Sequence, residues 1–136
     1  MNFLLDTNTC IALINKRPTS VRERFTRELG AGSQMLVSSV SIFELVYGAE
    51  KSSHRAGNEH AMNALLSSVS DTIPFENEDA RVAGRIRATL ERSGTPIGPY
   101  DLLIAAQAHR RDLVVVTANE REFRRVIGLR WENWAE

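Results

Sequence analysis

Short apolar runs that end in polar residues alternate with longer segments of helical periodicity, and this alternation limits the possible folds more than any other feature. The first run, Asn2–Leu5, is followed at once by Asp6, and the β-branched run Leu113–Val116 is followed by Thr117. Continuous apolar runs of this kind are typical of strands buried on both faces. The alternation therefore predicts an α/β fold in which helices cover both faces of a parallel sheet.

The predicted elements follow one another along the whole chain. Strands are expected at Asn2–Leu5, Met35–Ser38, Thr72–Phe75 and Leu113–Val116, with a last edge strand at Leu129–Trp131. Helices are expected at Thr9–Ile14, Thr19–Leu29, Ser41–Glu50, Ala61–Val69, Glu78–Arg92, Tyr100–Arg110 and Glu120–Arg125. Asn8 is the expected cap of the first helix, and Lys51–Glu59 is expected to be a loop or a frayed helix start. A length of 136 residues predicts one domain, 1–136.

Charge and cysteine content exclude several classes of protein. The formal net charge is zero, so no bulk field indicates a nucleic-acid or membrane partner. The single cysteine, Cys10, cannot form an internal disulfide or a Cys-rich zinc site, and it favours a reducing cytoplasm. Asp6 interrupts the first apolar run, and no apolar stretch approaches the roughly 20 residues of a membrane span. We therefore expect neither a signal peptide nor a membrane segment.

Three carboxylates stand in apolar surroundings: Asp6, Glu44 and Asp101. Each has an ordinary explanation. Asp6 can form a turn, Glu44 can close an S-x-x-E capping box with Ser41, and Asp101 suits the first turn of a helix. Two of the three lie within apolar helical segments, however, which favours a shared cleft. Ligands of parallel sheets bind beyond the carboxyl ends of the strands, where Asp6 and Asn119 are expected.

Convergence of the three acids would predict a metal site. Like charges in a partly dry cleft repel each other, and a divalent cation removes that repulsion. Hard oxygen ligands with open positions suit Mg²⁺ or Mn²⁺, and such an ion supports phosphodiester hydrolysis. Asn119 can orient a carboxylate or a water, while Thr7 and Thr117 can supply hydrogen bonds to the metal ligands.

Four segments, LLDTN, VSIFELVYGAEKS, GPYDLLIAAQA and VTANEREFRRVIGL, resemble the PIN-domain ribonucleases, and among them the VapC toxins of toxin–antitoxin pairs. The resemblance implies a PIN-like three-layer α/β/α sandwich with a central parallel sheet, and an endoribonuclease dependent on Mg²⁺ or Mn²⁺. Asp6, Glu44 and Asp101 match the first three acids of the family. The fourth position, often Asp, is Asn119 here. Asn brings no charge, so a second metal site is in question, and Glu122 is the nearest acid that can compensate.

The resemblance also implies partners. The expected substrate is structured RNA, most specifically the anticodon loop of initiator tRNA, whose cleavage inhibits translation. The expected protein partners are a second copy of the chain, forming a homodimer, and a VapB-type antitoxin that places a basic side chain at the carboxylates. DNA would be contacted only through the antitoxin. Among the basic residues, Lys16, Arg17 and Arg121 are the expected RNA contacts, because they follow short helices that start near the catalytic edge.

Other classes fit the sequence less well. A receiver domain needs a lysine late in the chain, and the only lysines are Lys16 and Lys51. A Rossmann domain needs a glycine-rich turn after the first strand, which LLDTN lacks. A metal-free ribonuclease would need histidines in its active site, and the histidines here are expected at the surface. They are His54, His60 and His109. The remaining alternative is a PIN-fold module that binds RNA or an antitoxin with weak or no nuclease activity.

Overall fold

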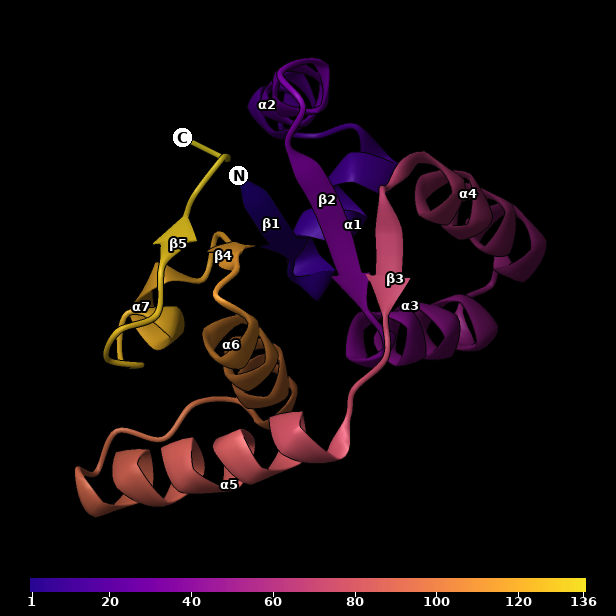
Figure 1. Ribbon diagram of the computed structural model, residues 1–136. Coiled ribbons are helices and arrows are strands. Elements are labelled where there is room, and N and C mark those ends of the chain that lie inside the picture. Colours follow the sequence, from indigo (N-terminus) through magenta and orange to yellow (C-terminus); the bar gives the residue numbers. More distant parts are fainter.

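The computed structural model describes residues 1–136 and contains a five-stranded parallel sheet with helices on both faces (Figure 1). The strands are β1 (Asn2–Leu5), β2 (Gln34–Ser38), β3 (Asp71–Ile73), β4 (Val114–Val116) and β5 (Trp131–Glu132), in the order β3-β2-β1-β4-β5. The helices are α1 (Thr7–Asn15), α2 (Thr19–Gly30), α3 (Ser39–Lys51), α4 (Arg55–Ser68), α5 (Asn77–Arg92), α6 (Pro99–Arg111) and α7 (Glu120–Phe123). This architecture confirms the predicted three-layer α/β/α fold.

Alternate residues of the central strand β1 enter two separate cores. Phe3 and Leu5 pack into a core completed by α1, α2, α4 and part of α3. Leu4 points to the other face and packs into a core completed by α5, α6 and α7. Figure 1 shows α2 and α4 on one side of the sheet and α5 and α6 on the other. The strand β4 lies between β1 and β5, and its three residues are buried, as its apolar sequence predicted.

Several boundaries differ from the predictions for local reasons. Asp6, rather than Asn8, caps α1, and its side chain accepts a hydrogen bond from the backbone N–H of Thr9. Ser38 caps α3, three residues before the predicted helix start. The segment expected to be a loop contains the start of α4, at Arg55. The first turns of α4 are polar on all sides, so the sequence shows no apolar periodicity there.

The register of the sheet determines where the active-site edge lies. Leu5 pairs with Val37 of β2 and with Val116 of β4. The next residue of each strand, including Asp6 and Thr117, therefore stands at the same level at the carboxyl edge of the sheet. None of the seven helices is long and apolar enough to cross a membrane.

Candidate active site

Asp6 lies at the centre of the carboxyl edge and is only 1% exposed. Its backbone N–H donates to Val116 of the neighbouring strand at 3.1 Å, and its Oδ1 accepts the N–H of Thr9 at 2.8 Å. The predicted turn role is thus present, but it uses only one carboxylate oxygen. The carboxylate also accepts a hydrogen bond from the Thr117 side chain at the end of the neighbouring strand.

Burial raises the pKa of Asp6, and hydrogen bonds from Thr117 and Thr9 offset only part of this effect. The nearby charge of Glu44 raises the pKa further. None of the ion pairs in the structure includes Asp6, Glu44 or Asp101. A buried carboxylate without a cation is costly to ionise, so this edge of the sheet favours binding of positive charge.

Glu44 extends from the second turn of α3 toward α1. Its Oε1 accepts a hydrogen bond from the Thr7 hydroxyl at 2.6 Å, and the Thr7 and Ser41 hydroxyls lie 2.9 Å apart. Because Ser38 is the cap of α3, the S-x-x-E capping box considered for Ser41 and Glu44 is wrong. Ser41 is completely buried and had no predicted role in the site. The only feature of the sequence that could have pointed to Ser41 was a hydroxyl within an apolar helical segment.

Asp101 lies in the first turn of α6, as predicted, and binds Asn119. The Asn119 side-chain Nδ2 donates to Asp101 Oδ2 at 3.0 Å, and the Asn119 backbone N–H donates to Thr117 Oγ1 at 2.9 Å. Burial raises the pKa of Asp101 to about 6; the hydrogen bond from Asn119 opposes this, whereas the charges of Asp6, Glu122 and Glu44 add to it. Asn119 therefore orients Asp101 and stabilises its charged form.

Glu122 holds the start of α6 beside these acids. Its Oε1 accepts the backbone N–H of Gly98, the N-cap residue of α6, at 2.7 Å. A Cβ atom at Gly98 would lie 3.4 Å from Glu122 Oε1 and 4.0 Å from Asp101 Oδ2. The missing side chain therefore keeps open the space between the two carboxylates. Sequence reasoning suggested Glu122 as a compensating acid but missed Gly98.

The donor set fits a hard divalent cation. Asp101 and Glu122 both border Gly98, Glu44 binds Thr7 next to Asp6, and the charges of Asp6, Glu44 and Glu122 all raise the pKa of Asp101. As they stand, no three His, Cys, Asp or Glu side chains are close enough to hold a metal ion together. Mg²⁺ needs only one or two carboxylates and keeps several waters. Asp6 and Asp101 suit this role best. Burial disfavours the charged forms of these two carboxyl groups, and a bound cation would stabilise those forms.

The residues predicted to contact RNA fall in two places. Arg121 lies in α7, two residues from Asn119, and it is exposed. Lys16 and Arg17 are also exposed but follow the far end of α1, nine or more residues from the Asp6 cap. At about 1.5 Å per helical residue, they lie on the order of 14 Å along the helix from Asp6.

Comparison with known proteins agrees with this geometry. The PIN domain family model matches residues 3–129. The tRNA(fMet)-specific endonuclease VapC of Shigella flexneri is 45% identical over 135 residues and 99% of each chain, and Ribonuclease VapC2 of Haemophilus influenzae strain Rd is 40% identical over 98% of each.

Crystal structures of two relatives share the fold almost completely. VapBC2 from Rickettsia felis, bound to a promoter DNA fragment, superposes with a TM-score of 0.91 at 34% identity over 98% of this chain and 99% of that chain. DNA-bound VapBC from Salmonella typhimurium gives 0.89 at 44% identity over 98% of both. The chain therefore belongs to the VapC family of PIN-domain proteins.

Proposed function

We propose that this chain is a divalent-metal-dependent endoribonuclease that acts as the toxin of a toxin–antitoxin pair. The observation that carries the proposal is the buried Asp6 carboxylate, which has no cation partner and whose pKa is raised by burial and by the charge of Glu44. A Shigella flexneri relative named as a tRNA(fMet)-specific endonuclease supports the same conclusion. Within this proposal the whole chain, 1–136, acts as one PIN domain in the cytoplasm.

In the proposed mechanism the chain's own residues orient the charges around the scissile phosphate. A bound Mg²⁺, with Mn²⁺ as a substitute, would activate water and neutralise the charge that develops on phosphorus. Asp6 and Asp101 would hold this ion, with Glu44 completing the acidic set. Thr7 fixes Glu44, Asn119 fixes Asp101, and Thr117 binds both Asp6 and the backbone of Asn119. These bonds limit the motion of the carboxylates before any substrate arrives.

The proposed substrate is structured RNA, most specifically initiator tRNA cut in its anticodon loop. Of the predicted RNA contacts, Arg121 has the best position because it is exposed beside Asn119. RNA contact by Lys16 and Arg17 stays a prediction, and these two residues lie at a greater distance from the acids. None of the three forms an ion pair with an acidic side chain, so all are free to meet phosphates.

The proposed protein partners are a VapB-type antitoxin and a second copy of this chain. Solved relatives are VapBC complexes, two of them with DNA, which supports an antitoxin partner and an indirect contact with DNA. An apolar patch beside the acids supports a homodimer. Its members are Phe43, Val46, Tyr47 and Tyr100, each at least 40% exposed, and the Phe43 and Tyr100 rings lie 5.5 Å apart. Light scattering of the purified chain measures this state directly.

Cleavage of initiator tRNA by purified protein, freed of antitoxin, tests the proposal. We expect one discrete cut with Mg²⁺ or Mn²⁺, none with EDTA, and none with Asp6→Asn. Cleavage that survives both EDTA and Asp6→Asn would contradict the carboxylate mechanism. If wild-type protein binds RNA but never cuts it, the chain is instead a PIN-fold binding module, an alternative that the uncharged Asn119 at the fourth acidic position favours.

A further inference from the structure

A groove of about 450 Å³ lies between α5, the end of α6 and the segment after α7, outside the carboxylate site. Arg85, His109 and Arg125 line it from three different elements, and none of its ten lining residues is acidic. Arg85 makes no ion pair, and Arg125 makes none either, although it donates to the carbonyl of Pro96 at 2.7 Å. In a chain with zero net charge, a groove lined only by basic, polar and apolar side chains favours an anionic ligand.

The groove begins next to the catalytic edge. Arg125 lies in the turn after α7, and its backbone N–H donates to the Glu122 carbonyl at 3.0 Å. Pro96, which Arg125 binds, precedes Gly98 by two residues, and Gly98 binds Glu122. The segment that leads into α6 therefore contacts both a groove residue, Arg125, and an acid of the site, Glu122. A polynucleotide leaving the acids can cross this segment and enter the groove.

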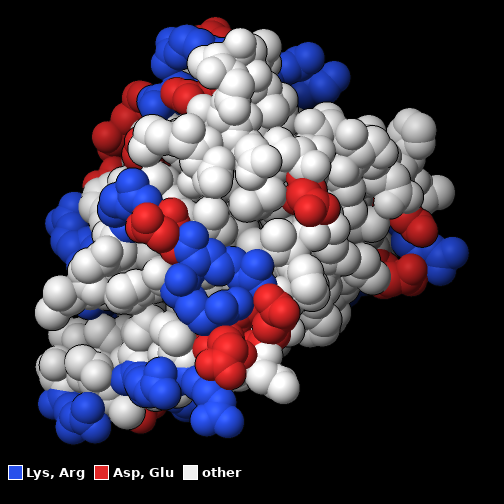
Figure 2. Space-filling view, viewed as in Figure 1, with Lys and Arg blue, Asp and Glu red and all other residues white.

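The rest of the lining suits a nucleotide strand. Ser93 contributes a hydroxyl that can donate to a phosphate or ribose oxygen, whereas the Thr89 and Thr95 hydroxyls donate to backbone carbonyls and can only accept from a ribose hydroxyl. The apolar side is formed by Ile86, Leu90, Val126 and Ile127. Ile127 is 89% exposed, the highest value among the large apolar residues, and offers a surface for a sugar or base. Figure 2 shows further basic side chains along α5, at the lower part of the face it presents.

We propose that this groove binds the backbone of the RNA strand next to the scissile bond, an inference that rests on the proposed ribonuclease function. The carboxylate site repels RNA until a cation is bound, because none of its four carboxylates is neutralised except as far as its pKa is raised, and the only basic side chain argued to lie beside it is Arg121. The groove supplies attraction that the acids cannot, and it orients the flanking strand before cleavage.

Arg85→Gln tests the proposal because Arg85 is exposed and its side chain has no recorded partner. We measure affinity for a tRNA anticodon stem–loop by fluorescence anisotropy at several salt concentrations, in EDTA so that the RNA stays intact. Loss of one phosphate contact should weaken binding about three- to tenfold and reduce the slope of log K against log salt by about one. Ile127→Ser should weaken binding without changing the slope. Arg27→Gln, at an exposed arginine on α2, is the matched control and should change neither.

Cleavage rates with Mg²⁺ separate failure of this inference from failure of the proposed function. Arg85→Gln should slow cleavage of the stem–loop but not of a substrate trimmed to the nucleotides at the cut. Wild-type cleavage with unchanged binding and rate in Arg85→Gln would overturn the groove alone. Loss of antitoxin binding in Arg85→Gln, with RNA binding intact, would assign the groove to a protein and also overturn the inference. A wild-type chain that neither binds nor cuts RNA would overturn both.

Discussion

Two aspartates, Asp6 and Asp79, are almost completely buried, at 1% and 0% exposure, yet their pKa values move in opposite directions. Burial by itself would raise both values. For Asp6 burial prevails and the pKa is raised. For Asp79 hydrogen bonds and the charges of two arginines outweigh burial, and the pKa is lowered. Burial of a carboxylate therefore does not identify a functional site; the missing counter-charge does.

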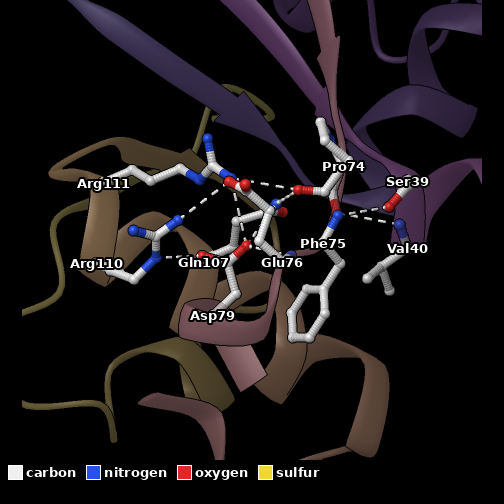
Figure 3. Close-up of polar contacts among 10 residues, drawn as sticks. Ser39, Val40, Pro74, Phe75, Glu76, Asp79, Gln107, Arg110 and Arg111 are labelled. Carbon is white, nitrogen blue, oxygen red and sulfur yellow. Dashed lines mark hydrogen bonds and ion pairs between the residues drawn. The ribbon is translucent and has the colours of Figure 1, made fainter. Parts of the chain in front are cut away.

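The surroundings of Asp79 show what complete compensation requires. Arg110 Nε donates to Asp79 Oδ1 at 2.6 Å, and the Glu76 backbone N–H donates to Oδ2 at 2.8 Å. Gln107 and Arg111 donate to Oδ2 at 3.3 and 3.4 Å, and Arg111 also binds Glu76. Figure 3 shows these side chains of α6 converging on Asp79 at the start of α5. This cluster joins two helices, and no charge remains for a ligand.

Asp6→Asn should produce the largest effect and separate function from stability. We expect RNA cleavage to fall about a thousandfold or more, because a proposed metal ligand is lost. The free energy of unfolding at neutral pH should stay equal or rise, since the variant removes a charge that burial disfavours and still offers an oxygen to the Thr9 N–H. Initial cleavage rates and urea unfolding measure the two quantities. A parallel loss of activity and stability would make Asp6 a structural residue like Asp79.

Asp79→Asn should show the opposite pattern. Breaking this buried ion pair from one side leaves Arg110 and Arg111 with only the more exposed Glu76 as counter-charge, at a cost on the order of 3 kcal/mol. The protein that stays folded should cleave RNA at the wild-type rate, because Asp79 binds α6 at Gln107 and Arg110, six and nine residues after Asp101. Urea unfolding and cleavage per folded molecule provide the test. Glu78→Gln, at the exposed neighbouring acid, is the control and should shift stability by no more than about 0.5 kcal/mol.

The two carboxylate environments should also give opposite pH dependences of stability. The pKa of Asp101 rises from 3.8 to about 6 on folding, so the folded state binds more protons between these values. Its contribution to stability therefore falls as pH rises through this window, by on the order of 1 kcal/mol after allowing for screening of a half-exposed group. The Asp79 pKa is lowered, so its contribution is present above about pH 4 and is lost as pH falls further.

Asp101→Asn isolates the first of these two dependences. Stability measured by urea unfolding from about pH 4 to pH 7 should decline less in this variant, with the remaining decline due to Asp6, whose pKa is also raised, while the loss below about pH 4 should persist. Asp79→Asn should do the reverse. If Asp101→Asn leaves the profile unchanged between about pH 4 and pH 6, the Asp101 pKa is not raised and its environment resembles that of Asp79.

The sequence predicted the acids of the active site more readily than their supports. Asp6, Glu44 and Asp101 stood out because each carboxylate interrupts an apolar segment, and the sheet register then explains why Asp6 and Thr117 meet. The bonds that orient these acids join residues far apart in the chain, such as Thr7 with Ser41 and Glu122 with Gly98. No local pattern encodes such a pairing.

The Asp79 cluster escaped prediction for the same reason. In sequence Asp79 resembles Glu78, an ordinary acid in the first turn of a helix, where a carboxylate is favourable. Its arginine partners lie 31 and 32 residues later, on α6. Capping assignments failed where two candidates were close together: Asp6 and Asn8, and Ser38 and Ser41. In each pair the residue at the buried end of a strand is the cap. Which residue is buried there depends on the assembled sheet.

Substitutions of Glu122 and Gly98 should have the smallest effects, and they test the comparison of Asp6 with Asp79 because Glu122 combines features of both aspartates. It is a carboxylate of the acidic site, but one oxygen is bound to the Gly98 N–H. Glu122→Gln keeps an acceptor for this N–H and removes a charge that raises the Asp101 pKa. If Glu122 mainly positions α6, Glu122→Gln should keep the cleavage rate within about threefold of wild type and shift the acid limb of the pH–rate profile to lower pH. Glu122→Ala should lower the cleavage rate about tenfold.

Gly98→Ala should cost only a few-fold in rate, since the new methyl would lie in ordinary contact with Glu122 Oε1 at 3.4 Å. Glu120→Gln, on the same helix, is the control, because Glu120 binds Asn133 and Arg124 instead of the acids. A loss in Glu122→Gln as large as that in Asp6→Asn would show that the charge of Glu122 is needed directly. The fourth acidic role would then belong to Glu122, and Asn119 would serve only to orient Asp101.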